Sequence, residues 1–204
     1  MQNLNQFLFY WINAPADPSG AAVLLARVFA EWLIYAIAIA MVWGWIRGSA
    51  GTRLCLIDAG VGATAALAIN FAIAAIWYHP RPFELGIGTQ ILPHAVDASF
   101  PSDHATVLFA VAFSLMISGA RQPWPGLALL AAVGAAWSRV YLGVHWPLDM
   151  VGSFVVALVS VWGVRRVAAT ASARHLRQGV LKIYDRTLDA LKIPGHVSPR
   201  AFRS

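Results

Sequence analysis

The chain has 204 residues, of which 59% are hydrophobic and 12% are charged. A soluble domain carries about 25% charged residues, so this composition excludes an ordinary soluble domain and indicates a membrane protein. The net charge is +6, but no soluble basic domain is visible. This excludes a nucleic-acid partner and makes the excess of Lys and Arg an indicator of membrane topology.

The first predicted element is a short helix. The segment Asn5 to Ile12 is apolar but too short to cross a bilayer. It carries four aromatic side chains, Phe7, Phe9, Tyr10 and Trp11. Aromatic rings favour the level of the lipid headgroups, so we expect an interfacial helix with all four rings at that level.

Five apolar stretches follow, at Leu24–Ile46, Leu54–Trp77, His104–Gly119, Gly126–Tyr141 and Leu148–Val164. A helix of about 23 residues, such as the first stretch, crosses roughly 30 Å of hydrocarbon at about 1.5 Å per residue. A turn-rich segment precedes this stretch and no small-residue cleavage site follows it, so we do not interpret it as a signal peptide. The third and fourth stretches are shorter, which favours helices packed in a bundle with their ends in protein rather than lipid. The sequence predicts an all-α integral membrane bundle with five transmembrane helices.

The chain becomes polar and basic after Arg166. Apolar residues recur there at helical spacing between charged ones: Leu176, Val180, Leu181, Tyr184, Leu188 and Leu191. This pattern predicts an amphipathic helix on an anionic membrane surface, and a partly disordered, solvated tail is the alternative. We therefore divide the chain into a membrane-embedded domain, residues 1–166, and a basic cytoplasmic tail, residues 167–204.

The distribution of basic residues predicts the orientation in the membrane. With five crossings, the helix ends near Trp77, His104, Tyr141 and Leu148 share one side. The other side receives twelve of the fifteen Lys and Arg residues: nine from residue 165 onward, and Arg47, Arg53 and Arg121. Basic residues favour the cytoplasmic side, so the four helix ends face outward. This face is the cell exterior or, in a cell with two membranes, the periplasm.

The outward helix ends hold an unusual concentration of polar side chains. The segments are, in chain order, His79-Pro80-Arg81-Pro82, Pro101-Ser102-Asp103-His104, Ser138-Arg139 and His145-Trp146-Pro147-Leu148-Asp149. Ionisable residues in membrane segments indicate a functional site by default. The four segments are distant in sequence but converge on one membrane surface, and we place the candidate site there.

Three of these residues indicate an anion site. Arg81 and Arg139 can hold a multiply charged oxyanion through several charge-assisted hydrogen bonds, which suits a phosphate and repels a metal cation. Ser102 stands at the N-cap position of the third apolar helix, so the free N–H groups of that helix start add to the anion site. The pattern therefore predicts phosphate binding without a metal ion.

The remaining motif residues indicate catalysis. Pro147 fits the first helical position of the fifth stretch, which places His145 and Asp149 four residues apart at the helix start. A carboxylate there can hold one imidazole nitrogen as N–H and leave the other nitrogen free to attack. His104 is the other titratable group, and it suits protonation of a leaving oxygen.

Some acidic residues and a histidine outside these motifs are not assigned to the site. Glu84, His94 and Asp97 lie in the outward loop, where solvated side chains are the default, with Glu84 the one closest to a headgroup contact. Asp58 lies near the cytoplasmic end of the second stretch and is interpreted as an interfacial residue.

The motifs together resemble the signature of the type 2 phosphatidic acid phosphatase superfamily: Arg81-Pro82, Pro101-Ser102-Asp103-His104, and Ser138-Arg139 followed by His145 and Asp149. Members of this superfamily are metal-independent lipid phosphatases related to vanadium haloperoxidases. The resemblance implies a phosphohistidine mechanism without a cofactor. It implies that His145 is the nucleophile, Asp149 its orienting partner, and His104 the general acid and then the base for water.

The resemblance also implies the phosphate contacts. Arg81, Ser102 and Arg139 would bind the phosphoryl oxygens, and Asp103 stands beside them where the family has glycine. The family commonly has a lysine seven residues before the first-motif arginine, and this chain has Ala74 there. His79 is the candidate substitute for that positive contact.

The two departures, Asp103 and Ala74, and the residues around the first two motifs resemble the bacterial undecaprenyl-diphosphatase branch of the superfamily. The implied function is hydrolysis of undecaprenyl diphosphate at the outer face of the inner membrane, with a polyprenyl phosphate and membrane lipids as partners. One alternative is a phosphatase for another lipid phosphate, such as phosphatidylglycerol phosphate or phosphatidic acid. A second is a transporter or scaffold that binds anionic headgroups, which does not explain two histidines with a carboxylate partner. A vanadate-dependent oxidase shares the motifs, but five crossings favour a lipid substrate.

Overall fold

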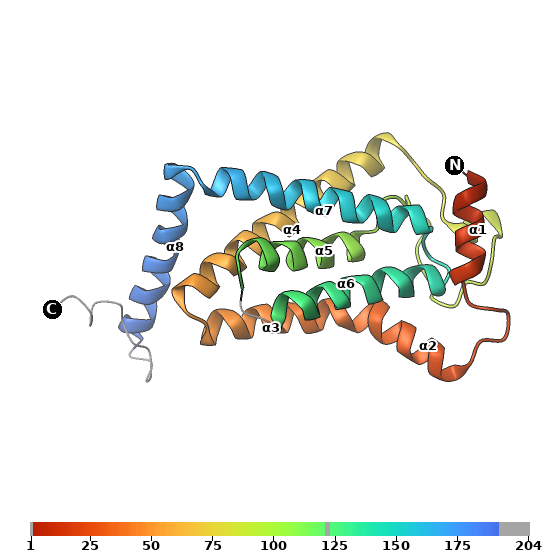
Figure 1. Cartoon of the computed structure of the whole chain (residues 1–204), viewed down its shortest axis with the longest axis horizontal. Helices are drawn as coiled ribbons and strands as arrows, with labels where there is room; N and C mark the ends of the chain where they lie inside the picture. The colour runs from red at the N-terminus through yellow and green to blue at the C-terminus, as the bar shows by residue number, and fades with distance from the viewer. Residues whose placement is uncertain (1, 121–122, 192–204) are drawn as a thin grey trace.

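The computed structural model describes residues 2–120 and 123–191, and the regular secondary structure in that part of the chain is helical, as expected. Five helices run side by side along one axis (Figure 1): α3 (Leu33–Arg47), α4 (Ala50–Ile76), α5 (Asp103–Ile117), α6 (Trp124–Tyr141) and α7 (Pro147–Ala168). The helix α2 (Gly20–Arg27) continues into α3 through a π-helical turn, Val28–Trp32. Each of the five predicted apolar stretches thus forms a helix, with ends within about one turn of those predicted.

Helix α5 forms the centre of the bundle, in contact with α4, α6 and α7. Its buried Phe109 and Phe113 rings lie 5.9 Å apart. The facing helices contribute fully buried alanines, among them Ala66, Ala132 and Ala157. Small residues allow helices to approach closely, so the two Phe rings fill the space between neighbouring helices.

Three helical segments are long and apolar enough to cross a membrane: Gly20–Arg47, Ala50–Ile76 and Pro147–Ala168. The other two helices of the bundle are shorter, 15 residues for α5 and 18 for α6. Both helices pack within the bundle, as their short lengths predicted, and they contact each other closely. Helix α6 also exposes apolar side chains on its outer face, among them Leu130 and Val133.

The N-terminal helix α1 (Gln2–Ile12) lies across the end of the bundle where α6 ends and α7 begins (Figure 1). Three of its four aromatic side chains are exposed. The expectation for the fourth was wrong, because Phe9 is fully buried with its ring centre 5.1 Å from that of Trp146. Phe9, Val140 and Trp146 form an apolar cluster, so one side of α1 faces protein instead of headgroups.

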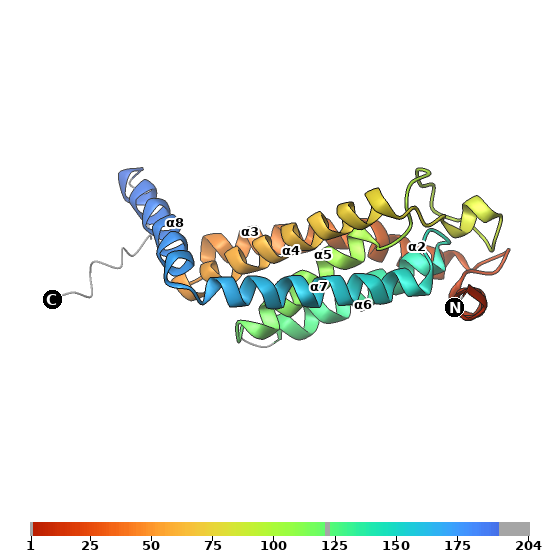
Figure 2. The ribbon, with the colours of Figure 1, turned by 90° about the horizontal axis from the view of Figure 1, so that it is seen from above.

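The last helix, α8 (Ala171–Ala190), lies across the opposite end of the bundle (Figures 1 and 2). Arg177 of α8 donates hydrogen bonds from Nη1 to both carboxylate oxygens of Asp58 on α4, at 2.7 and 2.6 Å. Asp58 is therefore an anchor for α8 and more than an interfacial residue. The tail was predicted to be either an amphipathic helix or a partly disordered segment, and the structure contains the helix. Residues 192–204 of the tail lie outside the described residues.

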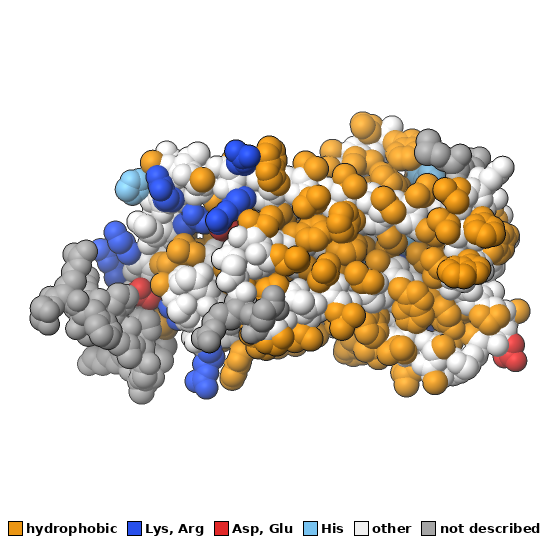
Figure 3. Space-filling view, viewed as in Figure 1, with side chains coloured by type: hydrophobic (Ala, Val, Ile, Leu, Met, Phe, Trp, Pro, Cys, Tyr) orange, Lys and Arg blue, Asp and Glu red, His pale blue; other side chains and the backbone are white. Residues whose placement is uncertain are grey.

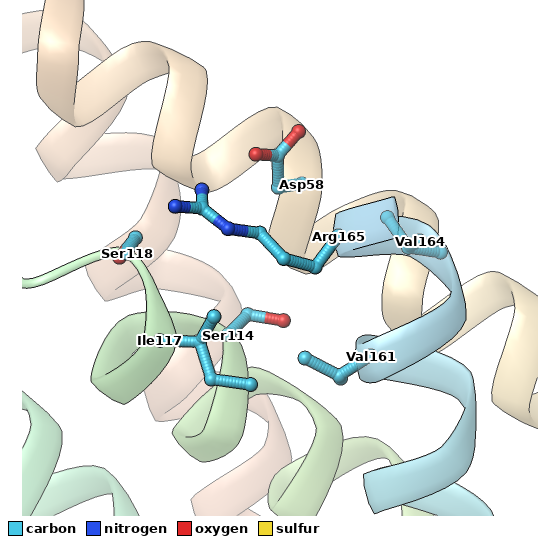
Figure 4. A pocket seen from close by; sticks show the side chains of 7 residues that line it. All are labelled: Asp58, Ser114, Ile117, Ser118, Val161, Val164 and Arg165. Carbon is cyan, nitrogen blue, oxygen red and sulfur yellow. The ribbon is translucent and has the colours of Figure 1, made fainter. Parts of the chain in front are cut away.

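A small cavity lined by both polar and apolar residues lies between α4, α5 and α7 near the α8 end (Figure 4). It is lined by Asp58, Ser114, Ile117, Ser118, Val161, Val164 and Arg165. Its volume of about 10 Å³ is close to that needed for one water molecule. This cavity is too small for a substrate group.

The two ends of the bundle differ in charge. Lys and Arg side chains gather at the end near α8, whereas apolar side chains cover the body of the bundle (Figure 3). The opposite end carries the loops 77–102 and 142–146, which hold the polar motifs. The described part of the chain thus has one basic end and one motif-bearing end.

We expect Asp58→Asn to loosen α8 from the bundle, because an amide cannot accept both of the hydrogen bonds from Arg177. A hydrogen bond to a charged group contributes roughly 1.5 kcal/mol, so trypsin should cleave within α8 about tenfold faster in the variant. The measurement is limited digestion of the purified protein in detergent. Asp189→Asn, at an exposed position of the same helix, is the matched control. Equal cleavage rates in both variants would contradict the anchoring role of Asp58.

Candidate active site

Arg81 is buried in the loop 77–102, with a side chain only 5% exposed. Its Nε donates to Asp97 Oδ1 at 2.7 Å, and its Nη1 donates to the Val144 carbonyl at 2.8 Å. Asp97 is exposed, as expected of a loop residue, but it also forms this ion pair. The Arg81 backbone N–H donates to Glu84 Oε1 at 2.8 Å, so Glu84 supports the loop. These partners hold the guanidinium in place, because a buried cation is stable only when it is paired.

The second motif begins α5. Ser102 is the N-cap residue, as predicted, and its backbone N–H donates to Ser153 Oγ of α7 at 2.9 Å. The Ser102 side chain is fully buried, and its Oγ has no hydrogen-bond partner among the described residues. A helix start presents free backbone N–H groups, so this hydroxyl and the first turn of α5 form a site suited to an anion.

Arg139 lies in the last turn of α6 and is 3% exposed. Within the described part of the chain, its Nε has no hydrogen-bond partner. A buried donor without a partner costs about 1–3 kcal/mol. An anionic ligand would satisfy it, and Arg139 is close enough to His145 to influence its protonation.

The turn after α6 positions the third motif. Gly143 has φ of +79°, and a Cβ atom there would lie 2.2 Å from the Thr89 carbonyl oxygen, so only glycine fits. Asn13 fixes the same region from the N-terminal segment. Its Nδ2 donates to the carbonyls of Thr89 and Tyr141 at 3.0 and 3.1 Å, and its Oδ1 accepts from the Thr89 N–H at 2.7 Å. These contacts set the backbone that leads into His145.

The hydrogen bonds of His145 define its tautomer. Nδ1 faces two acceptors, the Ser99 carbonyl oxygen at 2.9 Å and Asp149 Oδ2 at 3.3 Å. Arg81 Nη1 lies 3.1 Å from Nε2 and 3.5 Å from Nδ1, so this guanidinium does not distinguish the two nitrogens. Because a carbonyl oxygen only accepts, the Ser99 contact places the proton on Nδ1. The imidazole therefore keeps Nε2 unprotonated.

Asp149 lies in the first turn of α7, which begins at Pro147 as predicted. The carboxylate is fully buried. Its Oδ2 accepts from the Trp146 backbone N–H at 2.8 Å and from the Ser99 hydroxyl. The i to i+4 pair with His145 is thus formed, and a serine supports it.

The other predicted site residues lie at the same end of the bundle. His79 is partly exposed, and its Nδ1 lies 3.9 Å from Asp149 Oδ1. The Asp103 side chain accepts a hydrogen bond from Asn70 Nδ2 of α4 at 2.8 Å. The backbone N–H of Asp103 takes no part in this bond and can contact a phosphate. His104 follows in the first turn of α5 and is partly buried.

The loop histidines are all shifted toward the neutral form. Burial lowers the pKa of His145 well below its ordinary value, and the charges of Arg139 and Arg81 lower it further. Burial also lowers the pKa of His79 and of His94, whose ring centre lies 6.2 Å from that of His145. At neutral pH, Nε2 of His145 is therefore available as a base or a nucleophile.

Sequence reasoning missed Ser99 and Ser153. A signal existed for Ser153, because it lies one turn after Asp149 in an otherwise apolar helix and so shares its face. Its Oγ lies 2.8 Å from the Asp149 carbonyl and 3.0 Å from the Ser102 carbonyl. Ser99 lies in an irregular loop, where periodicity gives no signal.

The arrangement suits attack by a neutral imidazole on a phosphoryl group. Two guanidinium groups and a helix start can hold the phosphoryl oxygens, and His145 Nε2 lies beside one of those guanidinium groups. In residues 2–120 and 123–191, no group of three or more His, Cys, Asp or Glu side chains is arranged to hold a metal ion.

Comparison with known proteins gives an independent line of argument. The model of the PAP2 superfamily matches residues 55–173. YbjG of Escherichia coli (strain K12) is 38% identical over 160 residues, which cover 78% of this chain and 80% of that protein. The undecaprenyl-diphosphatase BcrC of Bacillus subtilis (strain 168) is 34% identical over 156 residues, 76% of this chain and 80% of BcrC.

A solved structure is similar in fold. The crystal structure of Aquifex aeolicus LpxE aligns with a TM-score of 0.67 over 80% of this chain and 95% of LpxE. The aligned residues are 20% identical, so this match bears on the fold alone.

We expect Arg139→Gln to raise the pKa of His145. Removing a nearby positive charge stabilises the imidazolium, so protonation of His145 should begin at a higher pH in the variant. NMR titration of isotope-labelled histidine in detergent measures this, with the His145 signal identified by its loss in His145→Gln. Arg174→Gln, on α8 at the opposite end, is the control. A pKa unchanged by Arg139→Gln would contradict the proximity of the two groups.

Proposed function

This chain belongs to the PAP2 superfamily, and on that premise we propose that it hydrolyses undecaprenyl diphosphate to undecaprenyl phosphate and phosphate. In the bacterial inner membrane this reaction recycles the carrier lipid of cell-wall synthesis. The observation that carries the proposal is the hydrogen bonding of the His145 ring. Its Nδ1 proton is held by two acceptors, and its free Nε2 lies 3.1 Å from a buried guanidinium.

The first half of the proposed reaction forms a phosphohistidine. His145 Nε2 attacks the terminal phosphorus of the diphosphate, and the bond from that phosphorus to the bridging oxygen breaks. His104 gives its proton to the departing oxygen of the lipid phosphate. Asp149 stabilises the positive imidazole that results.

The second half releases phosphate. His104 now lacks its proton and accepts one from a water molecule, which attacks the phosphohistidine. The bond between phosphorus and Nε2 breaks, the electron pair returns to Nε2, and inorganic phosphate leaves. Both histidines return to their starting protonation states, so no cofactor is consumed.

The phosphoryl oxygens are bound, in this proposal, by Arg81, Ser102 and Arg139 together with the backbone N–H groups at the start of α5. Unpaired buried donors at Ser102 and Arg139 support these assignments. Asp103 contributes through its backbone N–H. His79 takes the place of the family lysine at Ala74, and it does so as a neutral donor or as an imidazolium once the phosphate is bound.

We further propose that α2–α3, α4, α5, α6 and α7 are five membrane crossings, with the motif-bearing end outside and α8 at the cytoplasmic face. The basic residues at the α8 end support this orientation. The exposed apolar residues Leu176, Val180 and Ile183 support contact of α8 with the inner leaflet. A lipid diphosphate would then present its headgroup to the site from the outer leaflet.

Two other functions, a lipid-binding scaffold and a phosphatase for another lipid phosphate, explain fewer of these observations. A scaffold for anionic lipids needs arginines but does not need a tautomer-defined histidine with a buried carboxylate. A phosphatase for another lipid phosphate uses the same chemistry, and the similarity to BcrC favours the diphosphate.

We expect His145→Gln to abolish phosphate release, lowering kcat by at least about 10⁴-fold while the protein still inserts and folds. The measurement is phosphate release from undecaprenyl diphosphate, phosphatidylglycerol phosphate and phosphatidic acid in detergent with EDTA present. Wild type should be fastest on the diphosphate. An acid-labile, base-stable phosphoenzyme should be trapped in wild type and be missing from the variant.

His175→Gln, which removes an exposed histidine of α8, is the matched control and should behave as wild type. Full activity in His145→Gln would sink the proposed mechanism. Loss of wild-type activity in EDTA with recovery on adding magnesium would sink its metal-independence.

The orientation has its own test. In a Cys55→Ser background, a cysteine at Val96, which is 71% exposed in the outward loop, should react in intact cells or spheroplasts with a membrane-impermeant reagent. A cysteine at Ser172 of α8 should react only after the membrane is opened. The reverse pattern would place the site in the cytoplasm.

A further inference from the structure

Ser99 makes the shortest hydrogen bond to the His145 imidazole. Its carbonyl oxygen lies 2.9 Å from Nδ1, whereas the nearer carboxylate oxygen of Asp149 lies at 3.3 Å. Hydrogen bonds from N–H to oxygen are most favourable near about 2.9 Å. The backbone carbonyl is therefore the principal acceptor of the Nδ1 proton.

That carbonyl belongs to a segment with little freedom. Ser99 is fully buried, and its backbone N–H donates to the His79 carbonyl at 2.8 Å. The two residues before it both contact Arg81, Asp97 through its carboxylate at 2.7 Å and Ala98 through its carbonyl at 3.4 Å. The acceptor that faces His145 is thus held by contacts of three successive residues, 97 to 99.

The Ser99 hydroxyl makes a second contact. It donates to Asp149 Oδ2, which also accepts from the Trp146 N–H at 2.8 Å. Both donors converge on the same oxygen that faces Nδ1. Any group at that position must therefore be an acceptor, and this orients the carboxylate independently of the histidine.

We infer that Ser99 is a positioning residue whose backbone carbonyl sets the tautomer of His145 and whose hydroxyl fixes the carboxylate of Asp149. The consequence for the reaction rests on the function proposed above. In this arrangement the carboxylate stabilises the charged imidazole, while the proton location is determined by the backbone. The division of labour differs from a triad in which the carboxylate alone selects the tautomer.

The inference changes what Asp149→Asn should do. The Trp146 N–H requires an acceptor, and the Ser99 hydroxyl can donate to the same atom, so the new amide presents its oxygen toward Nδ1 and its NH₂ group away. The Nδ1–H tautomer is then retained. We expect kcat to fall by on the order of 10²-fold, well short of the roughly 10⁴-fold loss seen where a carboxylate alone holds the tautomer.

The closing experiment reads the tautomer directly. Nitrogen chemical shifts of His145 in labelled protein are recorded in detergent for wild type, Asp149→Asn, Asp149→Ala and Ser99→Ala. Because all four keep the Ser99 carbonyl, the Nδ1–H form should dominate in each. A switch to the Nε2–H form in Asp149→Ala would overturn the role of the carbonyl. This readout holds whatever lipid the enzyme uses, so it stands even where the proposed substrate fails.

Kinetics test the hydroxyl. Ser99→Ala should lower kcat on undecaprenyl diphosphate by about 10- to 100-fold with KM nearly unchanged, because the hydroxyl orients a catalytic group and touches no substrate. The matched control is Ser160→Ala, which removes a buried hydroxyl of α7 that has no hydrogen-bond partner within the described part of the chain. Equal kcat in Ser99→Ala and Ser160→Ala would overturn the role of the hydroxyl.

Discussion

The burial of Arg81 is the constraint on which the motif-bearing end depends. A guanidinium cannot lose its charge in a protein, so its removal from water requires partners for its donors. Those partners come from two distant segments, the loop at Asp97 and Ala98 and the turn at Val144 and His145. Satisfying one cation therefore brings together the end of α4, the approach to α5 and the turn before α7.

The polar groups of the site fall into two kinds with different uses. Arg81 and Asp149 Oδ2 have protein partners, which fix their positions and, through them, the ring of His145. Ser102 Oγ and Arg139 Nε have none among the described residues, although both are buried. Groups of the first kind supply geometry, and groups of the second kind supply free energy of binding to an anion. A site made only of the first kind would be precise but would bind weakly.

The sequence predicts those features that depend on residue type and spacing. Apolar length predicts the helices, and helix ends alternate sides, so the motifs necessarily share one end. The i to i+4 spacing places Asp149 next to His145. The burial of Phe9 and the role of Ser99 could not be predicted, because both depend on contacts between segments far apart in the chain. A carbonyl acceptor is invisible to any analysis of side chains, and this is the reason that the Ser99 contribution leaves no motif.

The hydrogen bonds of the Asn13 side chain have a consequence for biosynthesis. Its contacts reach Thr89 and Tyr141, 76 and 128 positions away in sequence, and the contact with Tyr141 cannot form until α6 has been synthesised. Contacts of such separation form slowly compared with helices, whose hydrogen bonds are local. A nascent chain can thus insert its helices before Asn13 has formed the hydrogen bonds that hold the backbone leading to His145. In the function proposed above, the site would become competent for catalysis only after these contacts have formed.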